Sequence, residues 1–338
     1  MRALALGTAA LAVTFAVQAS AADEVNVYSS RHYSTDQALY DGFTEATGIK
    51  VNLIEASGDA LIERLQAEGD ASPADLFVTA DAGRLVRAVE AGLFQPIQSD
   101  ALDAAVPEHL RSPDGLWYGL STRVRAIVYA KDRVDPSTIT TYEDLAEPAW
   151  EGRLCIRSSS NVYNQSLVAS MIATEGLDAA ERWAEGIVAN MARKPQGGDT
   201  DQIKAVASGE CDVAVSNHYY LARLISSENP EDKKVADAVD IIFPNQDGRG
   251  AHANISGAGV LVHAPHKEAA IAFLEYLATP QAQAYFADGN YEWPVVEGVK
   301  LGPILERWDA FKTDDIAVET YGKYNAEALK AMDRAGWQ

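Results

Sequence analysis

The fold is set by the stretch Cys211-Asp212-Val213-Ala214-Val215-Ser216-Asn217-His218-Tyr219-Tyr220-Leu221-Ala222-Arg223. Its first six residues form a short, mostly apolar run typical of a buried strand, and the apolar residues that follow recur at helical spacing. Tyr219 and Tyr220 therefore lie where a strand passes into a helix. In an α/β sheet this junction is at the carboxyl end of the strand, where ligands bind. Arg223 follows Tyr219 by four residues, so the two side chains share one helix face.

Two other tyrosines occupy the same kind of junction. Tyr33 follows a predicted strand over 25–28 and precedes Ser34–Gln37, which has the spacing of a capping box. Tyr163 follows the predicted strand that begins near Cys155 and precedes a predicted helix. Each of these tyrosines alone is more often a structural residue than a ligand. Three such junctions in one chain favour a shared binding site in a cleft.

The order of the predicted elements indicates an α/β fold with two lobes. A chain of 338 residues exceeds a single comfortable core. Strands and helices alternate from residue 25 to 91 and again from residue 153, which predicts a doubly wound mixed sheet with flanking helices in each lobe. Strands over 117–120 and 125–130 are expected to lead out of the first lobe. The predicted N-terminal lobe comprises 22–122 and 243–296, and the predicted C-terminal lobe comprises 123–242 and 297–338.

Two helix boundaries in the second half of the chain are also predicted from the sequence. Asp199 or Thr200 is expected to cap a helix over 201–207, and Gly209 is expected to end it. The last helix is expected to run without a break over 318–335.

The N-terminal residues of the chain indicate an exported protein. Residues 1–21 combine Arg2, an apolar run over 3–17 and the small residues of 19–21, which is the pattern of a secretory signal peptide. We therefore expect the mature protein in the periplasm. The formal net charge of −21 repels nucleic acid and anionic membranes, so neither is an expected partner.

The chain has two cysteines, Cys155 and Cys211. Paired cysteines in an exported protein favour a disulfide. Each lies at or near the start of a predicted strand of the second lobe, and neighbouring strands would bring them within reach.

Enzyme motifs are absent from the sequence. It contains no G-x-S-x-G, no phosphate-binding G-x-x-x-x-G-K-[ST] and no H-E-x-x-H, so we expect neither an enzyme nor an organic cofactor. The histidines do not show the spacing of metal ligands, and we interpret them as surface or turn residues: His218, His252, His263 and His266.

The chemistry of tyrosine points to a hard trivalent metal. Phenolates are hard anionic oxygen donors that suit Fe³⁺ better than softer metals. Four phenolates on Fe³⁺ leave one net negative charge, and a buried charge needs a counter-charge. Arg223, from helix geometry, and Arg123, from the segment between the lobes, are the predicted counter-charges. Arg31 and Arg125 are expected to be surface charges.

These residues resemble a known family, the periplasmic ferric-iron-binding proteins of bacterial iron ABC transporters, and most of all its tyrosine-rich cyanobacterial branch. The resemblance covers essentially the whole mature chain. It is carried by Val27-Tyr28-Ser29-Ser30-Arg31-His32-Tyr33, Tyr163-Asn164-Gln165-Ser166-Leu167, Asn217-His218-Tyr219-Tyr220, Ala278-Thr279-Pro280-Gln281-Ala282-Gln283 and Asn290-Tyr291-Glu292-Trp293-Pro294.

The resemblance implies a two-lobed fold of the type II periplasmic binding class with iron between the lobes. The residues that match the family's metal ligands are Tyr33, Tyr163, Tyr219 and Tyr220, with His32 as a further ligand or replaced by water. The resemblance also implies that Arg123 and Arg223 lie around these ligands without binding the metal.

The implied cargo is Fe(III), with Fe(II) left open, and the implied partner is an inner-membrane permease of an iron ABC transporter. We expect a monomer. Two alternatives stay open: a binding protein of the same fold for an organic or oxyanion solute, with aromatic stacking in place of coordination, and an extracytoplasmic enzyme.

Overall fold

A computed structural model of the protein describes residues 24–31, 33–308 and 311–338. The signal peptide predicted for residues 1–21 and the predicted ligand His32 lie outside these residues. Nine described strands form a mixed sheet in the order β2-β1-β3-β8-β4-β6-β5, and β7 and β9 both pair with β4. No helix in the described ranges is both long enough and apolar enough to cross a membrane.

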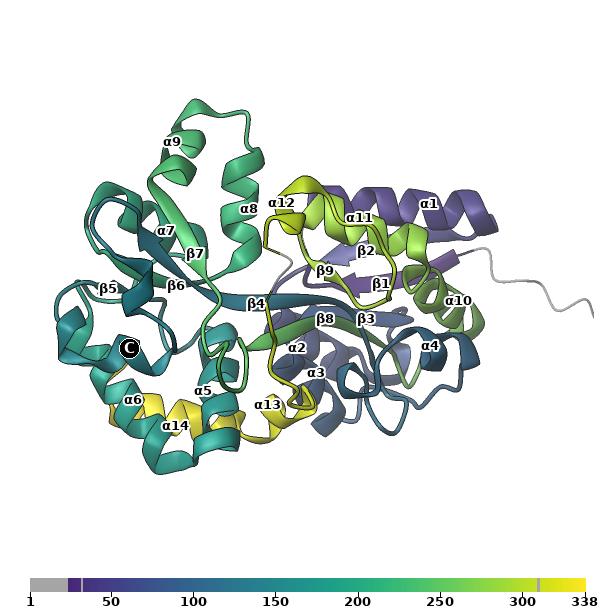
Figure 1. The fold of residues 1–338 in the computed structure, drawn as a ribbon. Coiled ribbons are helices and arrows are strands. Elements are labelled where there is room, and N and C mark those ends of the chain that lie inside the picture. The colour runs from purple at the N-terminus through teal and green to yellow at the C-terminus, as the bar shows by residue number, and fades with distance from the viewer. Residues whose placement is uncertain (1–23, 32, 309–310) are drawn as a thin grey trace, which may run out of the picture.

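The N-terminal lobe is built on the half of this sheet that contains β1, on the right of Figure 1. β1 is parallel to β2 and β3, and β8 runs antiparallel to β3, so the predicted doubly wound mixed sheet is confirmed. β3 is buried along its whole length, as expected for a central strand covered on both faces. The strands and helices of this lobe are β1 (Glu24–Ser29), α1 (Gln37–Thr47), β2 (Lys50–Glu55), α2 (Gly58–Glu68), β3 (Leu76–Ala80), α3 (Ala82–Glu90), α4 (Asp100–Ala105), β8 (Ala253–Val260), α10 (Lys267–Leu277), α11 (Pro280–Asn290) and β9 (Trp293–Pro294).

One long strand, β4 (Tyr118–Ala130), connects the two halves of the sheet (Figure 1). Residues 118–124 of β4 pair with β8, and residues 125–129 pair with β6. The sequence predicted two separate strands here. The structure joins them because the intervening residues, 121–124, continue the antiparallel pairing with β8.

The C-terminal lobe surrounds the other half of the sheet. Its strands are short, and β6 is buried along its whole length. The elements of this lobe are β5 (Leu154–Cys155), α5 (Val162–Glu175), α6 (Leu177–Asn190), α7 (Asp199–Ser208), β6 (Val213–Asn217), α8 (His218–Ser226), α9 (Pro230–Ala238), β7 (Val239–Ile242) and α12 (Pro303–Glu306). The residues at which the lobes divide stay a prediction.

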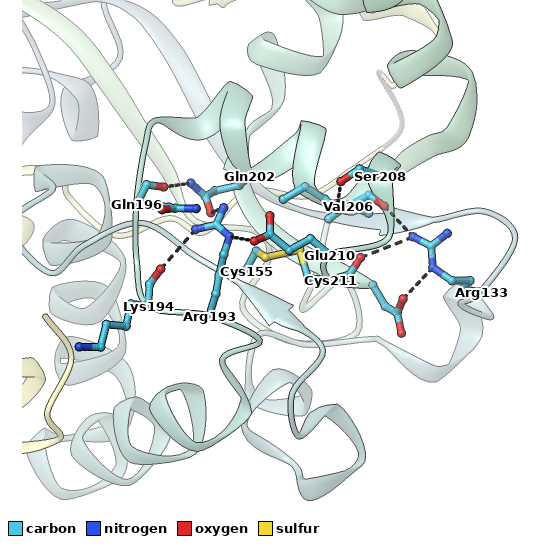
Figure 2. Close-up of a disulfide and its surroundings, with 12 residues drawn as sticks. Arg133, Cys155, Arg193, Lys194, Gln196, Gln202, Val206, Ser208, Glu210 and Cys211 are labelled. Carbon is cyan, nitrogen blue, oxygen red and sulfur yellow. Dashed lines mark hydrogen bonds and ion pairs between the residues drawn. A yellow bond between two sulfur atoms is a disulfide. The ribbon is translucent and has the colours of Figure 1, made fainter.

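The predicted disulfide is present in the C-terminal lobe. Cys155 ends β5, Cys211 lies just before β6, and their Cα atoms are 5.8 Å apart. Figure 2 shows the disulfide beside the ion pair between Arg193 and Glu210, whose Nε and Oε1 atoms are 3.1 Å apart. Because β5 and β6 are parallel neighbours, the disulfide links the end of β5 to the segment just before β6.

The last predicted helix is divided in two. α13 (Glu319–Lys323) and α14 (Asn325–Arg334) are separated by Tyr324, whose backbone leaves the helical region with φ −97° and ψ 6°. α13 contacts α3 of the N-terminal lobe and α5 of the C-terminal lobe, while α14 packs on α5 and α6. The approach to α3 is close: a Cβ atom on Gly322 would lie 2.3 Å from Val86.

Candidate metal site between the lobes

A cavity of about 650 Å³ lies between the lobes. Ser30, Tyr33 and Arg84 line it from the N-terminal lobe. Arg157, Asp199, Tyr163 and Tyr220 line it from the C-terminal lobe. Tyr33, Tyr163 and Tyr220 follow the carboxyl ends of β1, β5 and β6, where an α/β sheet places its ligands.

Tyr33 follows β1 and precedes a single 3₁₀ turn, Ser34–Asp36, which leads into α1. The capping box predicted for Ser34 and Gln37 does not form, since Ser34 lies inside the 3₁₀ turn and α1 begins only at Gln37, with Asp36 as its N-cap. Instead, the Asp36 carboxylate accepts hydrogen bonds from Arg31 Nε at 2.8 Å and from Asn290 Nδ2 at 2.6 Å. These contacts fix the turn that carries Tyr33.

Tyr163 lies in the first turn of α5, and three guanidinium groups surround its ring. Those of Arg123, Arg125 and Arg157 lie 5.3, 5.8 and 5.6 Å from the ring centroid. An aromatic face attracts cations at such distances. The next residue, Asn164, accepts a hydrogen bond from Arg125 Nη2 at 2.7 Å and donates to the Arg157 carbonyl at 2.9 Å.

Tyr219 and Tyr220 lie in the first turn of α8, which begins at His218 directly after β6, so the predicted strand-to-helix junction is confirmed. Their ring centroids are 4.3 Å apart. Tyr219 is fully buried and also meets Tyr33 edge to face, with centroids 6.4 Å apart. The structure therefore brings all four predicted tyrosines of the described chain together, one from the N-terminal lobe and three from the C-terminal lobe.

Both predicted counter-charges lie among these tyrosines. The Arg223 guanidinium lies 4.2, 5.1 and 5.9 Å from the ring centroids of Tyr33, Tyr219 and Tyr220. Arg123 is buried, and only its Nη2 makes a hydrogen bond within the described chain, to the Ile255 carbonyl at 2.9 Å. Its remaining buried donors suit an anionic oxygen in the site.

The expectation that Arg31 and Arg125 are surface charges is wrong. Each side chain is 2% exposed. Arg31 forms ion pairs with Asp36 and Glu292, both at 2.8 Å, and Arg125 pairs with Asp199 at 2.7 Å. The acidic partners except Asp36 are distant in the sequence, so local patterns could not reveal these pairs.

Arg157 and Asp199 are site residues that the sequence analysis missed. Asp199 was predicted as a helix cap, but α7 begins at Asp199 itself and its N-cap is Gly198, whose N–H donates to Asp201 at 2.6 Å. Arg157 received no prediction. Its position after the Cys155 strand and before Tyr163, at a strand end, was the available signal.

Burial raises the pKa of Tyr33, Tyr219 and Tyr220, and the neighbouring Tyr163 raises each of the three further. Arg123 works in the opposite direction for Tyr33 and Tyr219. Without a bound metal, these phenols are therefore neutral at pH 7. A metal that binds them as phenolates must displace their protons.

Two histidines are buried rather than exposed. His218 accepts a hydrogen bond from the Val124 N–H at its Nδ1 (3.2 Å) and contacts the Tyr291 carbonyl through its Nε2 (2.6 Å). Burial lowers the pKa of His218 to about 3. With both nitrogens used, His218 supports the backbone between the lobes and is not a metal ligand. His252 is also buried, next to the Tyr321 ring.

Other common metal donors do not cluster in the part of the chain that the structure describes. That part contains no group of three or more His, Cys, Asp or Glu residues able to hold a metal ion. The tyrosine cluster is accordingly the candidate metal site, and its hard oxygen donors fit a trivalent ion.

Comparisons with known proteins agree with this chemistry. The family model of bacterial extracellular solute-binding proteins matches residues 38–313. Iron uptake protein A1 of Synechocystis sp. is 52% identical over 315 residues, which cover 93% of this chain and 88% of that protein.

Solved structures give the same result. The Trichodesmium protein IdiA or FutA, in complex with iron and citrate ligands, superposes with a TM-score of 0.90 and 58% identity, covering 93% of this chain and all of that chain. A ferric binding protein from Campylobacter jejuni gives a TM-score of 0.89 and 41% identity, with coverages of 93% and 100%.

The matched family is one of solute-binding proteins and not of enzymes, as the sequence predicted. The two-lobed fold is likewise that of the ferric binding proteins. The chain belongs to the bacterial extracellular solute-binding proteins, in the group of periplasmic ferric-iron-binding proteins of ABC transporters that includes the cyanobacterial iron uptake proteins.

Proposed function

We propose that this protein captures Fe(III) in the interlobe cavity through tyrosine phenolates and delivers it to an ABC-type iron permease in the inner membrane. One observation carries the proposal: four tyrosines from both lobes meet at one site, and each has a guanidinium group within 6 Å of its ring centroid. The iron and citrate in the similar Trichodesmium structure support it. We place the protein in the periplasm, as a monomer.

The proposed ligands are Tyr33, Tyr163, Tyr219 and Tyr220, with His32 or a water completing the coordination. Fe³⁺ displaces the phenol protons as it binds, so affinity falls as the pH falls. The surrounding arginines offset the negative charge of an iron bound by four phenolates. This counter-charge allows the charged complex to lie in a site that is largely shielded from water.

The test is ligand replacement. Tyr219→Phe and Tyr220→Phe keep the ring and its packing but remove the donor oxygen. Each should shift or bleach the visible charge-transfer band and weaken ferric binding, measured by titration with ferric citrate. Tyr285→Phe is the matched control, since Tyr285 is an exposed tyrosine on α11. Full band and affinity in both site variants would refute the tyrosine site.

His32 and the identity of the metal have separate tests. His32→Ala should weaken binding less than a tyrosine replacement, because water can take one position on a hard ion. Ga³⁺, which cannot be reduced under these conditions, should compete with Fe³⁺. Zn²⁺ should bind more weakly, since oxygen donors without thiolate or imidazole favour the harder ion.

A second candidate is an oxyanion or organic solute without metal, and the cavity itself favours it. Its volume far exceeds that of a bare ion, and Arg84 and Arg157 both line it. Calorimetric titration of the metal-free protein with citrate and sulfate tests this alternative. Binding of either anion as tight as that of Fe³⁺ would support a solute-binding role, and no heat without iron would reject it.

A further inference from the structure

We infer that Asp199 is a positioning residue for the tyrosine site: its buried carboxylate holds Arg125 and Arg157 beside Tyr163, and Asn217 beside Tyr219. This inference rests on the proposed iron-binding function and assigns a role to a residue that is not itself a ligand. It concerns the C-terminal lobe, which supplies three of the four tyrosines.

Asp199 makes three hydrogen bonds although it is fully buried. Its Oδ2 accepts from Arg125 Nη1 at 2.7 Å and from the Asn217 backbone N–H at 2.9 Å. Its Oδ1 accepts from Arg157 Nη1 at 3.3 Å. One carboxylate thus joins three separate segments: β4, the loop after β5, and the end of β6.

Each of these partners reaches a proposed ligand. The guanidinium groups of Arg125 and Arg157 are the two that lie 5.8 and 5.6 Å from the Tyr163 ring centroid. The Asn217 amide lies 3.5 Å from the Tyr219 hydroxyl and also accepts from Arg125 at 3.3 Å. Asp199 therefore controls the surroundings of two tyrosines through groups that it binds directly.

The charge of Asp199 is required by Arg125. Arg125 is 2% exposed, and its other hydrogen-bond acceptors are the neutral amides of Asn164 and Asn217. A buried guanidinium without a counter-charge is strongly unfavourable. Arg157, whose side chain is 22% exposed, lies at the cavity and is free to turn into it once the carboxylate no longer holds it.

The direct effect of the carboxylate opposes metal binding. Asp199 and Tyr220 line the same cavity, and a nearby negative charge disfavours a phenolate. If Asp199 acted only as a charge, its neutralisation would strengthen iron binding. If it acts by placing the two arginines, its neutralisation weakens binding. The two roles have opposite signs and can be distinguished.

The experiment compares Asp199→Asn, Arg157→Gln and the double variant with wild type, by ferric citrate titration and visible absorbance. We expect Asp199→Asn to lower ferric affinity about tenfold or more and to shift the band, as supporting partners of metal ligands do. Arg157→Gln should lower it by a smaller factor. The double variant should bind no more weakly than Asp199→Asn, because both changes break one network.

The matched control is Asp212→Asn. Asp212 also accepts from two arginines, Arg133 and Arg153, both at 2.7 Å, but it lies away from the cavity, among partly exposed side chains. Its replacement should leave affinity and band unchanged. Asp199→Asn binding as tightly as wild type or tighter, or single effects that multiply in the double variant, would overturn the inference.

Two outcomes remain informative if Asp199→Asn does not fold. Arg157→Gln changes a partly exposed side chain and should fold, and unchanged ferric binding by this variant would also overturn the inference. A wild-type protein that shows neither band nor ferric binding would instead refute the proposed function itself. The two failures are therefore separate results.

Discussion

The guanidinium group of Arg223 lies 4.2 Å from the ring centroid of Tyr33, although α8 carries Arg223 in the C-terminal lobe and Tyr33 belongs to the N-terminal lobe. Arg223 Nη2 also donates to Asn290 Oδ1 at 3.2 Å, at the end of α11. One cation thus contacts proposed ligands of both lobes and the helix that supports Tyr33. Arg223 can place its positive charge beside both Tyr33 and Tyr219 only while the two lobes are close together.

Replacing Arg223 by alanine should weaken ferric binding about tenfold while leaving every proposed ligand in place. The loss of its positive charge makes each phenolate easier to protonate, and because the metal-free phenols are already protonated from pH 5 to pH 8, affinity should fall by a similar factor across this range. Ferric citrate titration across this range measures both effects. Arg334→Ala, at an exposed pair with Glu181, should behave as wild type. An Arg223→Ala variant that binds Fe³⁺ as tightly as wild type would contradict the role of charge.

Iron should draw the two lobes together. Because Tyr33 and Tyr219 come from different lobes, a metal bound to both favours the closed state by its higher affinity for that state. Small-angle scattering should show a smaller radius of gyration with saturating Fe³⁺ than without it. The Tyr219→Phe/Tyr220→Phe double variant is the control and should change less. An unchanged radius in wild type would argue against a site between the lobes.

The Cys155–Cys211 disulfide should stabilise the C-terminal lobe. It closes a loop of 56 residues that contains Arg157, Tyr163 and Asp199. Chain entropy predicts a stabilisation of about 4 kcal/mol for a loop of this length. Urea unfolding of Cys155→Ser/Cys211→Ser against wild type measures it. Dithiothreitol should destabilise wild type but not the double variant, and two alkylatable thiols in the untreated protein would exclude the bond.

His218 should make the protein less stable in acid. Burial lowers the pKa of His218 from the ordinary 6.5 to about 3, so below pH 6.5 the unfolded chain binds a proton that the folded chain does not. The free energy of unfolding should therefore fall as the pH falls from 6.5, by up to about 1.4 kcal/mol per pH unit from this group.

Urea unfolding between pH 8 and pH 4 tests the His218 prediction. His218→Asn removes the titrating group and keeps one donor and one acceptor, so its stability should depend less on pH even if it is lower at pH 7. His263→Asn changes an exposed histidine and should keep the wild-type slope. A slope that His218→Asn leaves unchanged would assign the acid sensitivity to other groups.

The alternation of strands and helices was sufficient to predict the two-lobed α/β fold. The disulfide was predicted from two cysteines of an exported chain that lie near the starts of predicted strands. The same alternation was also sufficient to place Tyr33, Tyr163, Tyr219 and Tyr220 at strand ends, because each follows an apolar run and precedes a helical pattern. Whether these tyrosines and His32 ligate iron is still a prediction. Local sequence was enough to place the four tyrosines in one region, because the carboxyl ends of the strands in an α/β sheet lie near one another.

The charged surroundings could not be predicted in the same way. Arg125 and Asp199 are 74 residues apart in the sequence, and Arg31 and Glu292 are separated by 261. An arginine in a polar segment has the same local pattern whether it is exposed or paired in the interior. The break at Tyr324 was also missed. It lets α13 contact both lobes while α14 packs on only one, and such tertiary contacts leave no local pattern in the sequence.

The path of β4 through both halves of the sheet has a consequence for how the nascent polypeptide acquires its structure. Residues 125–242 contain β5, β6, β7 and both cysteines as one uninterrupted segment. The N-terminal half, in contrast, receives β8 only after residue 253 and β9 only after residue 293. Since contiguous segments form earlier than pairings between distant ones, the second half of the sheet and its covalent bond should be complete while the first half still awaits two strands. Three of the four tyrosines are then in place before the fourth acquires its support from Asn290.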